Sequence, residues 1–274
     1  MRGLEGKNVL VTGGSSGIGR AIAIRFGQEG ANVAINYRSG LDAAHETQDE
    51  IEKSVGHCVQ CLQDEHKVKT VLVQADVSKE DDVKEMFETT TSSLGGIDFL
   101  INNAGFQRAG ESHEISVESF DSVIATNLRG SFMAAQHAIR HFLEQSKPGV
   151  IINISSVHQV IPKPRFLSYS VSKGGMQNLT RTLALEYAGR GIRVNGIGPG
   201  ATVTPINRAW VDDPVKREEV TQHIPMGRPA EAEEMGGLAA FLCSDDAKYI
   251  TGQTIFSCGG LTLYPDFREA WSSE

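Results

Sequence analysis

Short apolar stretches alternate with longer amphipathic segments along this chain of 274 residues. The short stretches are rich in Val and Ile and predict buried strands, whereas the longer segments repeat apolar residues at helical spacing. The predicted strands are Asn8–Val11, Val33–Ile35, Val71–Gln74, Phe99–Ile101, Val150–Ile154, Val194–Ile197 and Thr254–Phe256. The predicted helices are Ile18–Gln28, Leu41–Lys53, Glu80–Thr90, Val117–Leu143, Gly174–Ala188 and Glu231–Leu242.

This alternation favours a doubly wound α/β fold in which helices cover both faces of a parallel sheet of about seven strands. We expect a single domain over residues 1–274, because nothing in the sequence resembles a linker. A polar stretch at residues 57–69 predicts an inserted surface loop. The proline-rich stretch at residues 201–229 suits a lid over a substrate site at the strand ends.

The charge of the chain bears on its partners. A formal net charge of -8 and a pI near 5.5 disfavour binding to nucleic acid or to anionic membranes. No apolar run reaches the roughly 18 residues of a membrane span, and Met1–Lys7 lacks the features of a signal peptide. Four cysteines form no disulfide framework in a chain of this length. We therefore expect a cytoplasmic protein.

A glycine-rich turn separates the first predicted strand from the first predicted helix. Such a turn brings main-chain amides close to a pyrophosphate at the positive end of a helix, although a plain structural turn is the alternative. The predicted dinucleotide contacts are Gly13, Ser15, Ser16, Gly17, Ile18 and Gly19. A phosphate-binding loop of an NTPase is excluded, because Arg20 and Ala21 stand where that motif needs Lys and Ser or Thr. A Rossmann-type dinucleotide fold is the better reading.

The end of the second predicted strand bears on the choice of cofactor. Tyr37 and Arg38 stand near the position of the adenosine ribose, and no acidic residue is present there. The Arg38 guanidinium can pair with the 2′-phosphate of NADP, so we expect NADP to be accepted, alongside NAD. A solvated surface charge is the alternative for Arg38. Asp76 and Val77 end the third strand and are predicted to receive the adenine, although Asp76 also suits a helix N-cap.

Tyr169 and Lys173 are spaced by four residues, which places both side chains on one face of a helix. A free tyrosine has a pKa near 10 and is a poor base at neutral pH, but a nearby ammonium lowers that pKa. Tyr169 would then exchange a proton with a substrate oxygen while hydride moves to or from a nicotinamide ring. An ordinary exposed helix face is the alternative for this pair taken alone.

Several further motifs occur along the chain in a fixed order. They are Thr12–Gly19, Asn102-Asn103-Ala104-Gly105, Asn127, Ser156, Tyr169, Lys173 and Pro199-Gly200. In this order and spacing the chain resembles the short-chain dehydrogenase/reductase family over nearly its whole length. The combination is specific where each motif alone is weak.

The resemblance implies roles for individual residues. Ser156, which stands thirteen residues before Tyr169, corresponds to the family's catalytic serine and would hold the reacting oxygen, leaving Ser155 to packing. Lys173 would also bind the nicotinamide ribose, and Asn127 would anchor a water that leads from Lys173 to solvent. The remaining cofactor contacts implied by the family are Asn103, Ala104, Gly105, Pro199, Gly200, Thr202 and Thr204.

Within the family, the chain is most similar to bacterial glucose 1-dehydrogenases. The segments that carry this likeness are Ser155–His158, Lys173–Met176, Gly196–Ala201, Thr204–Asn207, Ile224–Gly227 and Tyr264-Pro265. The likeness implies a sugar substrate contacted by Ser156, His158 and Tyr169, and a homotetramer. Gln107 departs from the acidic residue that those enzymes carry after the Asn-Ala-Gly motif. His158 also suits an exposed loop histidine.

Three functions remain open from the sequence: a sugar dehydrogenase, a reductase of another carbonyl such as a 3-oxoacyl thioester, and a non-catalytic NAD(P)-binding sensor. Intact Ser156, Tyr169 and Lys173 disfavour the sensor. Cys58 and Cys61 form one Cys-x-x-Cys pair, whereas a structural zinc site takes ligands from two such pairs. We therefore expect no metal.

Overall fold

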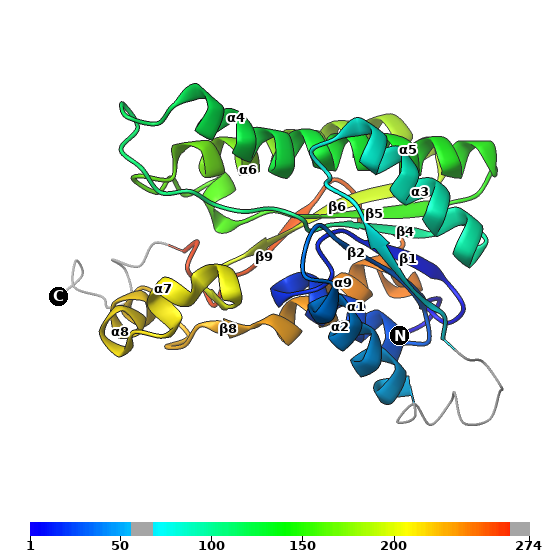
Figure 1. The fold of residues 1–274 in the computed structure, drawn as a ribbon, viewed down its shortest axis with the longest axis horizontal. Coiled ribbons are helices and arrows are strands. Elements are labelled where there is room, and N and C mark those ends of the chain that lie inside the picture. Colours follow the sequence, from blue (N-terminus) through cyan, green and yellow to red (C-terminus); the bar gives the residue numbers. More distant parts are fainter. Residues whose placement is uncertain (56–67, 264–274) are drawn as a thin grey trace.

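The computed structural model describes residues 1–55 and 68–263 of the chain. Its centre is a parallel sheet in the strand order β3-β2-β1-β4-β5-β6-β9 (Figure 1). The strands are β1 (Asn8–Val11), β2 (Asn32–Tyr37), β3 (Thr70–Gln74), β4 (Phe99–Asn102), β5 (Gly149–Ile154), β6 (Ile192–Pro199) and β9 (Thr254–Ser257). All seven predicted strands and the doubly wound α/β fold are confirmed.

The strand order reverses beside β1. From β1 the chain builds outward through β2 to β3, and then returns to place β4 against the other side of β1, with Val9 opposite Phe99. The crossovers on the two sides of β1 therefore run in opposite directions, and the loops at the carboxyl ends of β1 and β4 diverge. In open parallel sheets, this reversal point is where ligands bind.

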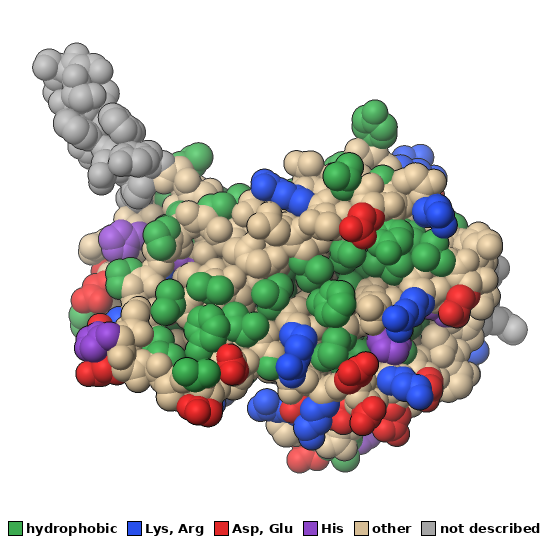
Figure 2. Space-filling model, turned by 90° about the horizontal axis from the view of Figure 1, so that it is seen from above, with side chains coloured by type: hydrophobic (Ala, Val, Ile, Leu, Met, Phe, Trp, Pro, Cys, Tyr) green, Lys and Arg blue, Asp and Glu red, His purple; other side chains and the backbone are tan. Residues whose placement is uncertain are grey.

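Helices cover both faces of the sheet, as predicted (Figure 1). One layer consists of α1 (Gly17–Gln28), α2 (Leu41–Val55) and α9 (Ala232–Cys243). The other consists of α3 (Glu80–Leu94), α4 (Val117–Ile124), α5 (Gly130–Glu144) and α6 (Leu167–Tyr187). Figure 2 shows hydrophobic side chains gathered on the outer surface of this second layer. Phe132, Val171 and Leu185 are among the exposed ones, and Leu185 is 86% exposed.

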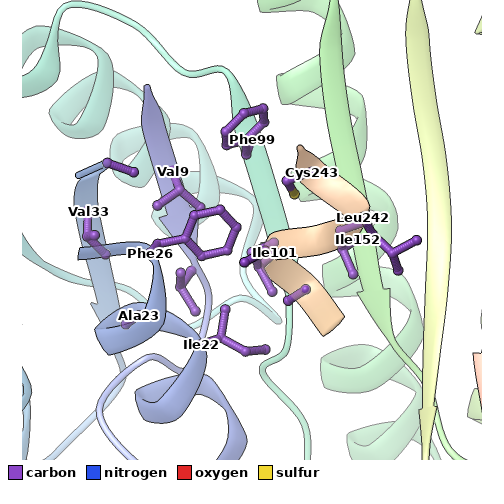
Figure 3. Close-up of a cluster of buried hydrophobic side chains, with 14 of the residues drawn as sticks. Val9, Ile22, Ala23, Phe26, Val33, Phe99, Ile101, Ile152, Leu242 and Cys243 are labelled. Atoms are coloured by element: carbon purple, nitrogen blue, oxygen red, sulfur yellow. The ribbon is translucent and has the colours of Figure 1, made fainter. Parts of the chain in front are cut away.

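Two hydrophobic cores fill the spaces between the sheet and its helical layers. Successive residues of a strand point to opposite faces, so Val9 and Val11 pack in one core and Leu10 in the other. In the first core, Phe26 of α1 packs against Phe99 with ring centroids 6.0 Å apart, among Ile101 and other apolar residues (Figure 3). Because strands buried on both faces need apolar residues at every position, the sequence shows short continuous apolar runs.

Two predicted helices differ from those in the structure. The helix predicted over Val117–Leu143 is interrupted between α4 and α5 by a π-helical turn at Ala125–Arg129, which contains Asn127. Such turns commonly lie at functional sites and insert a residue that apolar spacing does not reveal. The helix predicted over Gly174–Ala188 begins earlier, at Leu167, so that α6 includes Tyr169.

The stretch predicted as a lid at residues 201–229 contains short regular elements: β7 (Thr202–Val203), α7 (Arg208–Val211) and α8 (Pro214–Gln222). Thr202 of β7 pairs with Ala230 of β8 (Ala230–Glu231), so the stretch leaves and rejoins the domain at adjacent points. Most of the predicted insertion at 57–69, with Cys58 and Cys61, lies outside the described residues, as does Tyr264-Pro265. No helix within the described ranges is long and apolar enough to cross a membrane.

Candidate active site

A pocket of about 620 Å³ opens at the carboxyl ends of the central strands, where the strand order reverses. This volume suits a small-molecule ligand. All the predicted cofactor contacts line the pocket except Gly19 and Tyr37. Successive side chains of β2 alternate between faces, so Asn36 and Arg38 reach the pocket whereas Tyr37 is directed away and is buried.

The glycine turn is held by main-chain geometry and by Asn36. Gly13 and Gly17 have φ values of 62° and 52°, which side-chain-bearing residues rarely adopt. The main-chain N–H of Gly13 donates to Asn36 Oδ1 at 3.1 Å, and Asn36 Nδ2 donates to the carbonyls of Val73 and Ala75. Asn36 thus joins three adjacent strand ends. Sequence reasoning missed this residue, because an Asn inside an apolar strand carries no motif.

Gly19 contributes by packing. A Cβ at Gly19 would lie 2.2 Å from the Gly13 carbonyl oxygen and 2.4 Å from Asn103 Nδ2, so only glycine fits. Asn103 Nδ2 donates to the carbonyls of Thr12 and Gly13 at 2.9 and 3.1 Å, which ties the loop after β4 to the turn. Gly19 therefore packs closely beneath the turn and does not line the pocket, and its predicted contact with the dinucleotide stays a prediction.

The first turn of α1 suits a phosphate group. No acidic residue lies in that turn, and the side chain of the N-cap residue, Ser16, makes no capping hydrogen bond within the described chain. The main-chain amides at this positive helix end therefore have no acceptor from the Ser16 side chain, and Ser16, Gly17 and Ile18 line the pocket. This arrangement fits the pyrophosphate of a dinucleotide.

Arg38 and Asp76 lie at the far end of the pocket, beyond β2 and β3. Burial favours the neutral form of Asp76, but hydrogen bonds from Ser78 and the nearby Arg38 charge outweigh it, so the pKa of Asp76 is lowered. Asp76 Oδ1 accepts from the Ser78 hydroxyl at 2.7 Å and from its N–H at 3.0 Å. Lys79, not Asp76, is the N-cap of α3. Asp76 is therefore ionised and held in place near the charge of Arg38 at that end of the pocket.

Tyr169, Lys173 and Ser156 come together at the other end. Tyr169 and Lys173 project from α6 into the pocket, and the Lys173 ammonium lies 5.5 Å from the centroid of the Tyr169 ring. Ser156, two residues beyond the end of β5, is within hydrogen-bond reach of the phenol. Lys173 Nζ donates to the carbonyl of Ile154 at 2.7 Å. The pairing predicted from the four-residue spacing is therefore present in the fold.

The direction of the Tyr169 pKa differs from the sequence-based expectation. Burial raises the pKa of Tyr169, and the hydrogen bond from Ser156 offsets only part of that rise. Burial also lowers the pKa of Lys173, to about 8. The Lys173 ammonium is directed to the Ile154 carbonyl and does not overcome the burial of the phenol. The protein alone therefore holds Tyr169 as a protonated phenol, poised to donate.

Asn127 is fully buried and does not line the pocket. Its Oδ1 accepts from the N–H of Phe106 at 3.0 Å, and its Nδ2 donates to the Phe106 carbonyl and to the Ser172 hydroxyl. The side chain thereby connects the loop after β4 to α6, next to Lys173. The water-anchoring role implied by the family resemblance stays a prediction.

His158 stands beside Tyr169, with the ring centroids 6.2 Å apart. Burial lowers the pKa of His158, and the hydrogen bond to the Ile161 carbonyl only partly opposes this, with nearby Lys163 lowering the pKa further. Nδ1 donates to the Ile161 carbonyl at 3.0 Å, so the neutral ring offers Nε2 as an acceptor.

Several residues outside the predicted contacts complete this end of the pocket. They come from the segments after β4, β5, β6 and β9, and three of them, Val157, Ile206 and Asn207, lie in the segments similar to glucose 1-dehydrogenases. The wall is formed by Phe106, Val157, Lys163, Ile206, Asn207, Trp210, Val220, His223 and Leu261. Gln107, which departs from the glucose 1-dehydrogenase pattern, also lines the pocket, and its Nε2 donates to Asn207 Oδ1 at 3.4 Å.

Comparisons with known proteins agree with this site. A family model described as enoyl-(acyl carrier protein) reductase matches residues 13–262. The chain is 48% identical to a glucose 1-dehydrogenase of Gluconobacter oxydans over 268 residues, 98% of this chain and 96% of that enzyme. It is also 48% identical to 3beta-hydroxysteroid dehydrogenase 1 of Eggerthella lenta over 265 residues, 97% of each chain.

A solved structure from Agrobacterium tumefaciens, described as a candidate 2-deoxy-D-gluconate 3-dehydrogenase with bound NADP, superposes with a TM-score of 0.85. It is 32% identical and covers 95% of this chain and 98% of its own. The chain belongs to the short-chain dehydrogenase/reductase family. It is an NAD(P)-dependent oxidoreductase, and its glycine turn, α1 N-terminus and Lys173 fit that cofactor.

Proposed function

We propose that the protein is a sugar dehydrogenase, similar to glucose 1-dehydrogenase, that uses NADP and also accepts NAD. The observation that supports this most is the set of polar side chains that line the same pocket as Tyr169: Gln107, His158, which lies beside the Tyr169 ring, Asn207 and His223. Each sugar hydroxyl that leaves water needs a replacement hydrogen bond, and these groups supply donors and acceptors. The Trp210 ring offers an apolar surface for the C–H face of a sugar ring.

In the proposed reaction, the glycine turn, the α1 N-terminus and Lys173 would hold NAD(P), whose nicotinamide would supply the hydride chemistry. Ser156 holds the substrate oxygen, and Tyr169 takes up or returns its proton. Lys173 stabilises the phenolate by its charge, while His158 Nε2 accepts from a neighbouring hydroxyl. Residues 201–229 act as the lid, since Thr202, Thr204, Ile206, Asn207, Trp210, Val220 and His223 all face the pocket. Arg38 is assigned to the 2′-phosphate of NADP.

A second candidate is a hydroxysteroid dehydrogenase. The same wall contains Val157, Ile206, Trp210, Val220 and Leu261, enough apolar surface to receive a rigid hydrocarbon. The Eggerthella lenta relative is as similar to this chain as the sugar enzyme is. Substrate turnover distinguishes the two candidates.

The test is a panel of aldoses, hydroxysteroids and 3-oxoacyl thioesters, each assayed with NADP or NADPH and with NAD or NADH by the absorbance of the reduced cofactor. We expect an aldose to give the highest kcat/KM. A higher value for a steroid or a thioester would replace the proposed substrate. The pattern across NADP and NAD reports on the role of Arg38 in the same experiment.

We also propose a cytoplasmic homotetramer. The exposed apolar side chains of Phe132, Val171 and Leu185 on α5 and α6 support a contact with a second copy through this layer. Cys243 and Cys258 are free thiols, which suits a reducing compartment. Sedimentation of wild type and Leu185→Glu tests the assembly. We expect the wild type to sediment as a tetramer and the variant as smaller species.

A further inference from the structure

Lys163 is a cation at the substrate end of the pocket that the proposed mechanism does not use. It lies in the loop between β5 and α6 and lines the pocket. The positive charge of Lys163 contributes to lowering the pKa of His158, which stands beside Tyr169. Its ammonium lies 4.1 Å from the centroid of the Phe166 ring. The residue as a whole is exposed, but its charged end is partly enclosed, and this burial lowers the pKa of Lys163.

The charges of the pocket are unbalanced at this end. Among the described residues that line it, Asp76 is the sole carboxylate, and it lies at the adenosine end beside Arg38. No ion-pair partner of Lys163 is present in residues 1–55 and 68–263, whereas the neighbouring Arg165 of the same loop pairs with Glu111. An enclosed cation without a protein counter-charge favours an anionic ligand.

The loop that carries Lys163 is held in place by the neighbouring loop after β4. Arg165 adopts a φ of 69°, which is uncommon for a residue with a side chain. Its carbonyl accepts from the N–H of Gly110 at 2.9 Å, and its guanidinium pairs with Glu111 at 3.2 Å. Backbone of this kind persists only where its surroundings fix it, and such residues cluster at ligand sites. Lys163 is therefore presented from a fixed loop.

We propose that Lys163 determines specificity by binding an anionic group, a carboxylate or a phosphate, of the sugar that Tyr169 acts on. This proposal rests on the proposed sugar dehydrogenase function and narrows its substrate class to acidic sugars. A chain with a net charge of -8 repels such substrates at long range, so a local cation at the pocket is needed to hold one.

The test compares substrates that share one reacting carbon. D-Glucose, D-glucuronate and D-glucose 6-phosphate have the same C1 hemiacetal, and the last two add a carboxylate or a phosphate at C6. We expect the wild type to prefer one of the anionic sugars. Lys163→Met should lower kcat/KM for that sugar by about tenfold to hundredfold, mainly through KM, as for loss of a charged hydrogen bond. For D-glucose, which carries no anionic group, the fall in kcat/KM should be several-fold smaller than for the anionic sugar.

Two further variants complete the design. Lys163→Arg keeps the charge and should retain most of the anion preference. Lys84→Met removes an exposed lysine of α3 that pairs with Glu88. This variant should leave kcat and KM for all three sugars unchanged. Equal effects of Lys163→Met on D-glucose and on the anionic sugars, or no effect on either, would overturn the inference while leaving the sugar dehydrogenase in place. Absence of turnover with all three sugars in the wild type would overturn both.

Discussion

The two ends of the pocket are built in different ways. At the cofactor end, buried Asn36, half-buried Asn103 and the glycine turn are joined by hydrogen bonds of 2.8 to 3.2 Å, many of them to main-chain atoms of adjacent strand ends. At the substrate end, the pocket wall is formed by side chains from separate loops, such as Gln107 and Asn207, which contact each other at 3.4 Å, and Ile206 is 47% exposed.

This difference follows from what each end has to bind. A dinucleotide has one shape, so a site made from backbone and small residues on rigid strands suits it. Substrates vary within a family, and loops can exchange side chains without disturbing the sheet. We therefore expect substitutions at the cofactor end to change folding and cofactor binding, and those at the substrate end to change KM for the substrate. Single substitutions at each end can test that division.

The largest effect is expected where the two ends meet, at Tyr169. Tyr169→Phe removes the proton donor and should lower kcat by about a hundredfold to ten-thousandfold. NADPH affinity should stay nearly unchanged, because the dinucleotide contacts remain. Steady-state kinetics and a fluorescence titration with NADPH measure the two quantities. Activity comparable to wild type would contradict the mechanism.

Gly19→Ala tests the rigidity of the cofactor end. The added Cβ would collide with the Gly13 carbonyl and Asn103. We expect the free energy of unfolding to fall by about 1–3 kcal/mol and the NADPH Kd to rise, as for overpacking of a tight contact. The control is Gly174→Ala, which meets no atom within 4 Å on α6 and should stabilise the helix slightly. If the free energy of unfolding changes equally in both variants, the close packing of Gly19 against Gly13 and Asn103 does not stabilise the cofactor end.

Arg38→Leu separates the two cofactors. Loss of a charge-assisted bond to the 2′-phosphate should raise KM for NADP by about tenfold or more and leave KM for NAD nearly unchanged. Kinetics with each cofactor at saturating substrate measure this. An equal rise in KM for NAD and for NADP would contradict the contact with the 2′-phosphate and favour the alternative, in which Arg38 is a solvated surface charge.

Gln107→Ala addresses the substrate end. Losing a neutral hydrogen-bonding side chain should raise KM for the preferred sugar by about threefold to tenfold, with kcat and NADPH affinity little changed. The same assays that characterise Tyr169→Phe apply. A loss of NADPH affinity in this variant would show that the two ends are not separable.

The smallest effect expected is a pH dependence. Burial holds the pKa of Lys173 at about 8, so its ammonium is present below that pH and is lost as the pH rises through it. Tyr169 remains protonated over this range because its pKa is raised. In the direction of carbonyl reduction, kcat/KM for NADPH should be constant at low pH, where Lys173 is protonated. It should fall as the pH rises and reach about half of that constant value near pH 8. A profile that stays flat well above this pH would mean that the charge on Lys173 is not required.

The sequence predicted the fold closely because its signals are local. Continuous apolar runs such as Val150–Ile154 mark strands buried on both faces, and Gly13 and Gly17 mark the turn. Sequence did not reveal the π-helical turn at Ala125–Arg129, since apolar spacing continues on either side of it. It also missed Asn36, whose partners Val73 and Ala75 lie far along the chain.

By itself, the sequence determined the β-α order, the glycine turn and the spacing that puts Tyr169 and Lys173 on one helical face, because each depends on residues close together in the chain. Tertiary structure alone decided which loops meet around the phenol. It also decided the direction of the Tyr169 pKa, because burial raises that pKa and the hydrogen bond from Ser156 offsets only part of the rise. The exclusion of solvent from a side chain depends on every segment packed around it, so the spacing of residues along the chain does not predict it.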